Sequence, residues 1–193
     1  MSRHSVPPRQ VRIIGGQWKR TPLPVPDAEG LRPTPDRVRE TLFNWLDHLL
    51  DRDWSDQRCL DLFAGSGALG FEAASRGAAS VLMVEALPAA CKALQAVRDK
   101  LGARQVEIRR ADALSQLPSL AGPFDLIFLD PPYGKQLLPS VLTACVRLLA
   151  PGGLVYAESD QPFAADNESW LADWQALRAG KAGAVHFVLL ARA

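Results

Sequence analysis

Cysteine, histidine and long apolar runs are all scarce in this chain of 193 residues. Its three cysteines, Cys59, Cys91 and Cys145, lie far apart and show neither CxxC nor Cys/His spacing. This pattern indicates neither a zinc site nor a disulfide framework. The histidines form no recognisable catalytic set. We therefore expect no metal, and we expect a reducing compartment, the cytoplasm.

Segments that would place the chain in or across a membrane are also lacking. No apolar run approaches the roughly 20 residues of a membrane-spanning helix, and the N-terminus has no apolar core of a secretory signal. A hydrophobic content of 48% with 22% charged residues is typical of a globular chain. We expect a soluble monomer without a membrane partner, built as one domain or as one domain with a short appendage.

Acidic residues are absent from the first twenty positions, which hold five basic ones: Arg3, Arg9, Arg12, Lys19 and Arg20. The net charge of the whole chain is only +1, so the distribution of charge is more informative than its sum. Clustered cations without compensating acids favour contact with the phosphates of a nucleic acid. For any single arginine, a solvated surface position remains the alternative.

The chain divides near Asp56 into two regions of different character. The first, residues 1–55, has many prolines and the pair Gly15 and Gly16, which favour a strand or hairpin followed by a loop. An amphipathic helix then follows, with Asp36 as a plausible N-cap and apolar residues at helical spacing through Leu50. We expect residues 1–55 to form a basic arm and a helix, and residues 56–193 to form the main domain.

The second region alternates between apolar runs and helical patterns. The candidate strands span residues 58–64, 80–85, 105–109, 124–130 and 153–158. Such alternation predicts an α/β fold with a mainly parallel sheet that has helices on both faces. Two further runs, 174–177 and 184–190, flank the turn RAGKAG and predict a C-terminal antiparallel hairpin.

A glycine-rich turn follows the first of these strands in CLDLFAGSGALGFEAASRGA. Gly65, Gly67 and Gly70 satisfy GxGxxG, and Glu85 ends the next strand about 20 residues on, where an acid can bind ribose hydroxyls. Asp61 stands just before the turn. Its carboxylate would repel the pyrophosphate of a nicotinamide cofactor, but it can help to hold the cationic end of S-adenosylmethionine. A turn used only for packing is the remaining alternative.

A third acid, Asp112, follows the next candidate strand. It can accept a hydrogen bond from an adenine amino group, or it can cap the short helix that follows. Asp61, Glu85 and Asp112 thus stand at successive strand ends. Ligands of such sheets bind outside the carboxyl ends of the strands, so this order favours the cofactor interpretation.

The fourth strand ends in DPPY, where Asp130 and the Pro131 carbonyl can accept both hydrogens of a planar exocyclic amine. Pro131 and Pro132 fix the backbone that carries these acceptors. Tyr133 offers a ring on which a base can stack. Holding the amine lone pair toward a methyl donor can supply much of the catalysis. A proline-terminated strand with a surface turn is the plainer alternative.

These motifs resemble those of class I S-adenosylmethionine-dependent methyltransferases, and specifically of [ND]PP[YF] enzymes that methylate exocyclic amines of bases. The likeness extends over nearly the whole chain. The segments RIIGGQWKRTPLPVP, LRPTPDRVRETLFNWL, CLDLFAGSGALGFEAASRGA, VEALPAA, FDLIFLDPPYGK and GAVHFVLL together resemble the RsmD family of 16S rRNA guanine-N2 methyltransferases.

The resemblance implies a Rossmann-like, seven-stranded methyltransferase sheet with a small N-terminal extension. It also implies S-adenosylmethionine as cofactor and a guanine in the 16S rRNA of the small ribosomal subunit as substrate. The residues that it assigns to the cofactor are Asp61, Phe63, Ala64, Gly65, Ser66, Gly67, Glu85, Ala86, Asp112 and Ala113. Asp130, Pro131, Pro132 and Tyr133 would hold the target guanine. Contacts to RNA are expected from Arg12, Lys19 and Arg20 of the arm and from Arg32, Thr34, Arg37 and Arg39 of a signature beside the active site.

Three rival functions remain open. A DNA methyltransferase acting on adenine N6 or cytosine N4 would use the same DPPY geometry. A nicotinamide-dependent oxidoreductase would use the same glycine turn, although Asp61 disfavours it and no hydride-transfer constellation is visible. A non-catalytic RNA-binding module would keep the fold without binding a cofactor.

Overall fold

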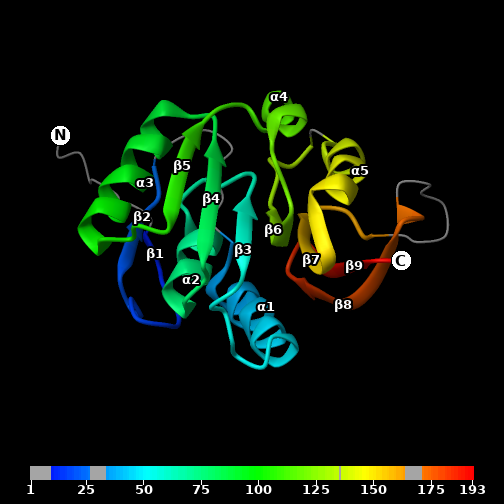
Figure 1. The fold of residues 1–193 in the computed structure, drawn as a ribbon, viewed down its shortest axis with the longest axis horizontal. Helices are drawn as coiled ribbons and strands as arrows, with labels where there is room; N and C mark the ends of the chain where they lie inside the picture. Colours follow the sequence, from blue (N-terminus) through cyan, green and yellow to red (C-terminus); the bar gives the residue numbers. More distant parts are fainter. Residues whose placement is uncertain (1–9, 27–33, 135, 164–170) are drawn as a thin grey trace, which may run out of the picture.

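A central sheet with helices on both faces organises the computed structural model, which describes residues 10–26, 34–134, 136–163 and 171–193 (Figure 1). The strands are β1 (Gln10–Arg12), β2 (Pro22–Pro24), β3 (Arg58–Asp61), β4 (Ser80–Glu85), β5 (Val106–Arg110), β6 (Phe124–Leu129), β7 (Leu149–Ser159), β8 (Trp174–Ala182) and β9 (Val185–Arg192). The helices are α1 (Asp36–Leu49), α2 (Ala68–Arg76), α3 (Pro88–Leu101), α4 (Ala113–Gln116), the 3-10 turn η1 (Leu117–Ser119) and α5 (Leu138–Leu148).

Seven strands form the main sheet in the order β5-β4-β3-β6-β7-β9-β8. Strands β3 to β7 pair in parallel, whereas β9 runs antiparallel to both of its neighbours, β7 and β8. The order reverses at β3, where the chain moves from one half of the sheet to the other. The predicted α/β fold, with a mainly parallel sheet and a C-terminal antiparallel hairpin, is confirmed. The reversal also puts the turns after β3 and β6 side by side, at the edge where such sheets bind ligands.

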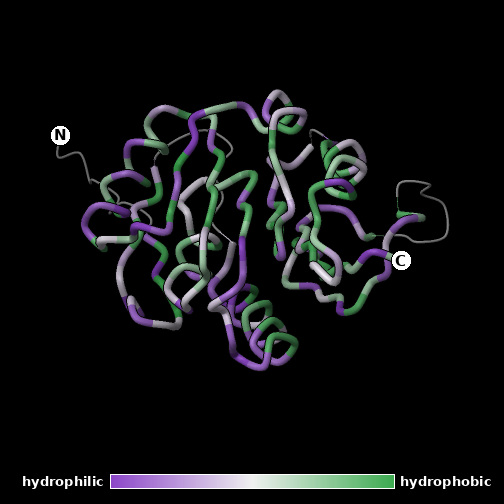
Figure 2. The backbone as a smooth tube through the Cα atoms, viewed as in Figure 1, coloured by the Kyte–Doolittle hydropathy of each residue, from purple (hydrophilic) through white to green (hydrophobic). Residues whose placement is uncertain are grey.

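Buried apolar side chains lie on both faces of the sheet, because successive strand residues point to opposite sides. Figure 2 shows hydrophobic residues gathered along the central strands. Leu126 and Phe128 face the cluster that includes α1, α2 and α3, whereas Ile127 and Leu129 face the cluster that includes α5. The residue after Leu129 continues this alternation, so Asp130 lies toward α1.

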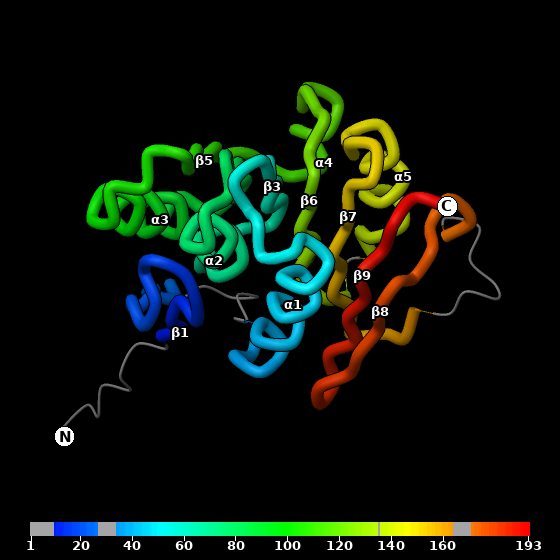
Figure 3. The backbone as a smooth tube through the Cα atoms, turned by 60° about the horizontal axis from the view of Figure 1, so that its bottom comes forward, coloured from blue at the N-terminus to red at the C-terminus, as the bar shows by residue number. Residues whose placement is uncertain are grey.

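The N-terminal hairpin, β1 and β2, lies beside α2, on the sheet face opposite α5 (Figure 3). Val11, Ile13 and Leu23 belong to the same buried cluster as Phe71 of α2 and Phe128 of β6. The described part of the predicted arm, residues 10–26, is thus packed on the main core. Of the expected strand or hairpin, a hairpin is present, and the helix predicted through Leu50 is present as α1, which ends at Leu49.

The predicted role of Asp36 as N-cap is wrong. Pro35 occupies the cap position without a side-chain cap bond, and Asp36 is the first helical residue. Its carboxylate is bound by two arginines, Arg39 at 2.6 Å and Arg12 at 3.4 Å, so it is not free to cap the helix. Within the described residues, no helix is long and apolar enough to cross a membrane.

Candidate active site at the carboxyl end of the sheet

The glycine turn after β3 allows the chain to bend sharply into α2. Gly67 has a φ of 78°, and a Cβ atom there would lie 2.5 Å from the Leu94 side chain. At Gly70 a Cβ atom would lie 2.5 Å from Met83 of β4. Glycine is therefore needed twice, once for the left-handed backbone and once for close packing of α2 on the sheet. Around these glycines Phe63 and Ser66 are partly exposed, whereas Ala64 is buried.

Asp61 lies beneath this turn. Its carboxylate accepts the N–H of Gly70, in the first turn of α2, at 3.0 Å. Burial raises the pKa of Asp61 to about 7, although backbone hydrogen bonds from Gly70 and Phe63 oppose the change. The side chain is almost fully buried. It therefore supports the turn from the protein interior and adds negative charge there.

Glu85, at the end of β4, organises the other side of the turn. One carboxylate oxygen accepts the N–H of Gly65 at 2.8 Å, and the other accepts the N–H of Leu87 at 2.7 Å. Each oxygen keeps a further lone pair, which can accept a hydroxyl. Ala86 beside it is exposed.

Asp112 follows β5, the next strand along the sheet, and its side chain is exposed. It accepts the N–H of Ser115 at 3.0 Å and so caps α4, while Ala113 is buried. The capping role weighed in the sequence is therefore present, and the second carboxylate oxygen remains available for a ligand. The three acids stand at the carboxyl ends of the adjacent strands β3, β4 and β5.

The DPPY segment leaves β6 next to the glycine turn. Asp130 and Tyr133 are partly exposed, Pro131 is buried and Pro132 is exposed. The Thr34 hydroxyl, which comes from the segment before α1, lies 3.1 Å from Asp130 Oδ2. Burial and the nearby charge of Glu158 raise the pKa of Asp130 well above its usual range.

Two residues of β7, Glu158 and Tyr156, were not predicted from the sequence to belong to this site. The Thr34 hydroxyl also lies 3.0 Å from Glu158 Oε1, which accepts the Tyr156 hydroxyl at 2.8 Å. Burial raises the pKa of Glu158 to about 7 and also raises that of Tyr156. The available signal was an acid at the end of an apolar strand, two residues after a tyrosine, on the strand that follows DPPY.

Arg39 and Thr34 do not have the environment expected of RNA contacts. The Arg39 side chain is 0% exposed, and its guanidinium donates to the backbone oxygens of Thr34 and Arg12 and to Asp36. It therefore has no surface left for a phosphate. Thr34 is likewise buried against the two carboxylates. The structure thus corrects the expectation for these two residues, because it gives both an internal role at the base of the site.

The remaining predicted RNA contacts lie on the surface where they are described. Arg12, Lys19, Arg20 and Arg37 all have solvent-accessible side chains. Arg12 is paired with Asp36, but its side chain is 68% exposed, and such a pair holds a surface arginine only weakly. Arg32 lies outside the described residues.

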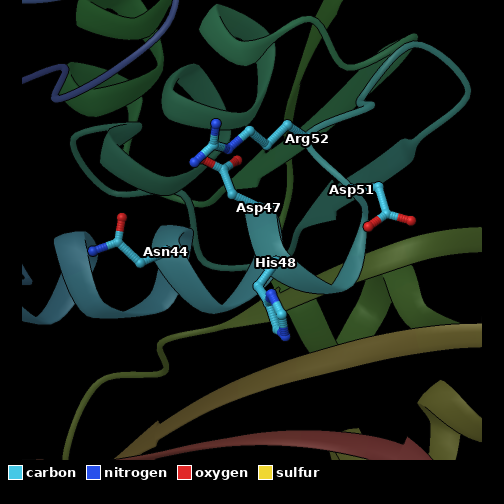
Figure 4. Close-up of a pocket in the computed structure, with 5 residues that line it drawn as sticks. All are labelled: Asn44, Asp47, His48, Asp51 and Arg52. Carbon is cyan, nitrogen blue, oxygen red and sulfur yellow. The ribbon is translucent and has the colours of Figure 1, made fainter.

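A separate surface hollow lies at the C-terminal end of α1 and is lined by Asn44, Asp47, His48, Asp51 and Arg52 (Figure 4). Asp47 pairs with Arg76, in the last turn of α2. Because α2 begins at the glycine turn, its last turn lies toward the amino ends of the strands. The hollow is therefore remote from the candidate active site.

The strand order, with one antiparallel strand between β7 and β8, and the glycine turn that faces an acid on β4 define the class I methyltransferase fold. A family model described as conserved hypothetical protein 95 matches residues 11–191. The chain belongs to this family, the RsmD family of methyltransferases.

Individual relatives agree with this assignment. Ribosomal RNA small subunit methyltransferase D of Escherichia coli (strain K12) is 44% identical over 153 residues, which is 78% of this chain and 75% of the relative. The protein of the same name from Haemophilus influenzae is 41% identical over 160 residues, 79% of this chain and 80% of the relative. The solved structure of yhhF from Escherichia coli, a proposed methyltransferase, has a TM-score of 0.83 and 41% identity, and covers 95% of this chain and 98% of its own.

Proposed function

We propose that this enzyme transfers a methyl group from S-adenosylmethionine to the exocyclic N2 amine of a guanine in 16S rRNA, within the small ribosomal subunit. The observation that carries the proposal is the position of DPPY beside the glycine turn, with Asp130 held by Thr34. The relatives named as ribosomal RNA small subunit methyltransferases support the class of substrate. The N2 position and the assembled subunit go beyond those names.

The residues at the carboxyl end of the sheet fit S-adenosylmethionine. Asp61, Asp130 and Glu158 are acids whose pKa values are raised mainly by burial, and nearby acids, Glu85 for Asp61 and Glu158 for Asp130, raise them further. A ligand with a sulfonium and an ammonium group would relieve that repulsion, whereas a pyrophosphate would increase it. We assign the ribose hydroxyls to Glu85 and the adenine to Asp112 and Ala113, with Phe63, Ala64, Gly65, Ser66, Gly67 and Ala86 forming the remaining wall. When bound, this cofactor supplies an electrophilic methyl group.

Catalysis by this chain then consists mainly of orientation. Asp130 and the Pro131 carbonyl accept the two amine hydrogens, which turns the nitrogen lone pair toward the methyl group. Pro132 stiffens the turn and Tyr133 stacks on the guanine. Because a base in a duplex hides its amine, the guanine has to be unpaired or extruded.

RNA binding is assigned to the accessible cations Arg12, Lys19, Arg20 and Arg37, and Arg32 stays a prediction. Residues 1–55 would thus form the RNA-contacting part and residues 56–193 the methyltransferase part, acting as a monomer in the cytoplasm. Phosphate contacts of this kind position the RNA, and they make affinity fall with added salt.

The test is incubation of the protein with radiolabelled S-adenosylmethionine and small ribosomal subunits from cells that lack the enzyme, followed by nucleoside analysis. We expect label in N2-methylguanosine, and less label with naked 16S rRNA. Label on another nucleoside would overturn the assigned target atom. Label on duplex DNA without label on the subunit would favour the DNA methyltransferase alternative.

A further inference from the structure

One hydroxyl group bridges two carboxylates at the base of the candidate site. Thr34 Oγ1 lies 3.1 Å from Asp130 Oδ2 and 3.0 Å from Glu158 Oε1. Thr34 and Glu158 are buried. Asp130 is part of the DPPY segment that would meet the substrate, whereas Glu158 lies deeper, on the neighbouring strand β7.

The number of protons in this cluster is constrained by its geometry. A hydroxyl has one hydrogen to donate, and two ionised carboxylates offer none. If both acids were ionised, one of the two contacts would join oxygens without a hydrogen between them. With one added proton both contacts are hydrogen bonds, because one acid donates to Thr34 and Thr34 donates to the other.

The added proton has two alternative places. It can reside on Glu158, with Thr34 donating to Asp130, or on Asp130, with Thr34 donating to Glu158. The two arrangements differ only in which atoms carry hydrogens, so no side chain has to move. In both of them the Tyr156 hydroxyl can donate to Glu158 Oε1.

Charged groups around the pair act on its two acids in opposite directions. Asp61 and Glu158 add negative charge near Asp130, whereas Arg39 adds positive charge near Glu158. Tyr156 and Tyr133 are the other titratable groups facing the cluster, and Tyr156 donates to the Glu158 carboxylate. Burial, the largest cause, raises the pKa of Glu158 to about 7 and that of Asp130 well above its usual range.

Methylation of an amine requires a group that accepts a proton. As the N–C bond forms, the electron pair of the broken C–S bond stays on sulfur, and the amine nitrogen becomes positively charged with one proton to lose. We propose that Thr34 and Glu158 are positioning residues that complete a proton acceptor with Asp130, which takes up this proton. This inference rests on the proposed function.

The step starts from the form of the pair in which both acids are ionised, the form present above the upper titration step, and the proton balance then closes within the cluster. The amine N–H bond breaks and the proton passes to Asp130. Asp130 then donates to Thr34 Oγ1, and the Thr34 hydroxyl proton passes to Glu158 Oε1. At the end Asp130 is again ionised, Thr34 is again a hydroxyl and Glu158 is a neutral acid, which later releases its proton to water.

The first test needs neither cofactor nor RNA. The side-chain carboxyl carbons of aspartate and glutamate are labelled with ¹³C in the free protein and followed by NMR as pH changes, with Asp130→Asn and Glu158→Gln used to assign the signals. We expect the two signals to titrate together, with one step near neutral pH. Thr34→Val should uncouple them, and Thr34→Ser, which keeps the hydroxyl, should not. Independent titrations at ordinary acidic pH would overturn the proposal.

The second test is the single-turnover rate of methyl transfer as a function of pH. In wild type the rate should rise with pH through the upper step of the pair. Glu158→Gln removes the like charge beside Asp130, so the midpoint should move to lower pH and the plateau should fall about tenfold, because Asp130 becomes a weaker base. Tyr156→Phe removes a hydrogen bond that favours ionised Glu158, so its midpoint should move to higher pH.

A purely structural role for Glu158 would lower the rate at every pH without moving the midpoint, and that result would overturn the proposal. Failure of the proposed function would give a different experimental result. In that case the wild-type protein would label no nucleoside of the small subunit, while the titration of the free protein would still report on the coupled pair.

Discussion

Arg37 and Arg39 lie two positions apart on α1, yet their environments are opposite. Arg37 is solvent-accessible, whereas the Arg39 guanidinium is fully buried and donates to Thr34, Arg12 and Asp36. Arg39 thereby fixes the backbone of Thr34, whose hydroxyl holds Asp130. One arginine of the signature thus supports the site from the interior, and the other is exposed to solvent.

Replacing Arg39 by Met should destabilise the protein by about 3 kcal/mol, because buried carbonyl groups lose their donor. Arg37→Met is the matched control on the same helix, and its effect on stability should stay within about 0.5 kcal/mol. Urea-induced unfolding measures both values. The control should instead weaken RNA binding and reduce its salt dependence by about one charge. Equal stability losses in the two variants would contradict this assignment.

Replacing Asp130 by Ala should lower the rate of methyl transfer by at least about 100-fold, because the amine loses an acceptor that orients it. Cofactor affinity, measured by calorimetry, should stay largely unchanged. Asp130→Asn keeps an acceptor oxygen and should retain more activity than Asp130→Ala. Full activity of the alanine variant would remove Asp130 from the proposed mechanism.

At the scale of elements, the N-terminal hairpin is attached to α2 by a set of specific polar contacts. The buried Glu72 carboxylate accepts the N–H groups of Ile14 and Gly15 at 2.6 and 2.8 Å, and Ser75 accepts the N–H of Trp18 at 2.9 Å. Arg76 links Glu72 to Asp47 of α1. The exposed cations Lys19 and Arg20 are therefore held beside the last turn of α2, at the end of the helix away from the glycine turn.

Gly16 is a sensitive point of this attachment. Its φ is 73°, and a Cβ atom would lie 2.0 Å from the Ser75 carbonyl oxygen. Gly183, in the turn between β8 and β9, has a φ of 61°, and a Cβ atom there would meet nothing within 4 Å. Gly183→Ala should cost about 1 kcal/mol for the left-handed backbone alone. Gly16→Ala should cost at least about 2 kcal/mol more, since backbone atoms have to separate.

Unfolding in urea measures both glycine variants, and limited proteolysis shows whether the hairpin has detached. We expect early cleavage between residues 10 and 26 in Gly16→Ala, with cofactor binding retained. Similar stability in the two variants would show that the hairpin is not held by this contact.

The sequence predicted the positions of the strands better than it predicted where they end. The run 80–85 matches β4, and 124–130 exceeds β6 by one residue, because buried parallel strands are continuous apolar runs. The strand expected over 58–64 ends at Asp61, since the chain already bends into the glycine turn. The run 174–177 extends to Ala182, because β8 is an edge strand whose Arg178 and Lys181 are not required to be apolar.

For the candidate site, sequence motifs predicted the acids at or just after the strand ends but not the buried residues that contact them. Asp61, Glu85, Asp112 and Asp130 were predictable, because strand order alone brings their ends together. The contact of Thr34 with Glu158 joins residues 124 positions apart, and no local pattern encodes it. The burial of Arg39 depends on the same long-range packing, which the sequence does not show. Its charge alone therefore suggested a surface role.

At the scale of the whole molecule, folding places several acids in a poorly hydrated region of the sheet edge. Burial raises the pKa values of Asp61 and Glu158 to about 7, compared with ordinary values of 3.8 and 4.5. The folded protein thus binds protons more tightly than the unfolded chain does. Protonation of these acids stabilises the folded state fully below about pH 4, and this stabilisation is lost as pH rises through about 7.

The free energy of unfolding of the cofactor-free protein should therefore decrease between about pH 4 and about pH 7, since each unit of raised pKa corresponds to about 1.4 kcal/mol. Asp61→Asn should reduce this slope, because the amide can still accept the Gly70 N–H but does not titrate. Asp99→Asn, at an exposed position of α3, is the control and should leave the slope unchanged. Urea titrations at several pH values measure it, and a flat or rising profile would contradict the prediction.

The same acids link proton binding to cofactor binding. If a cationic cofactor binds at the carboxyl end of the sheet, it favours the ionised form of these acids. By reciprocity, their ionisation favours binding of the cofactor. The affinity for S-adenosylmethionine should therefore increase over the pH range in which the free protein loses stability, with protons released on binding. Calorimetry in buffers of different ionisation enthalpy measures that release. S-adenosylhomocysteine, which lacks the sulfonium charge, should release fewer protons, and equal release by the two ligands would show that the buried acids do not sense the charge on sulfur.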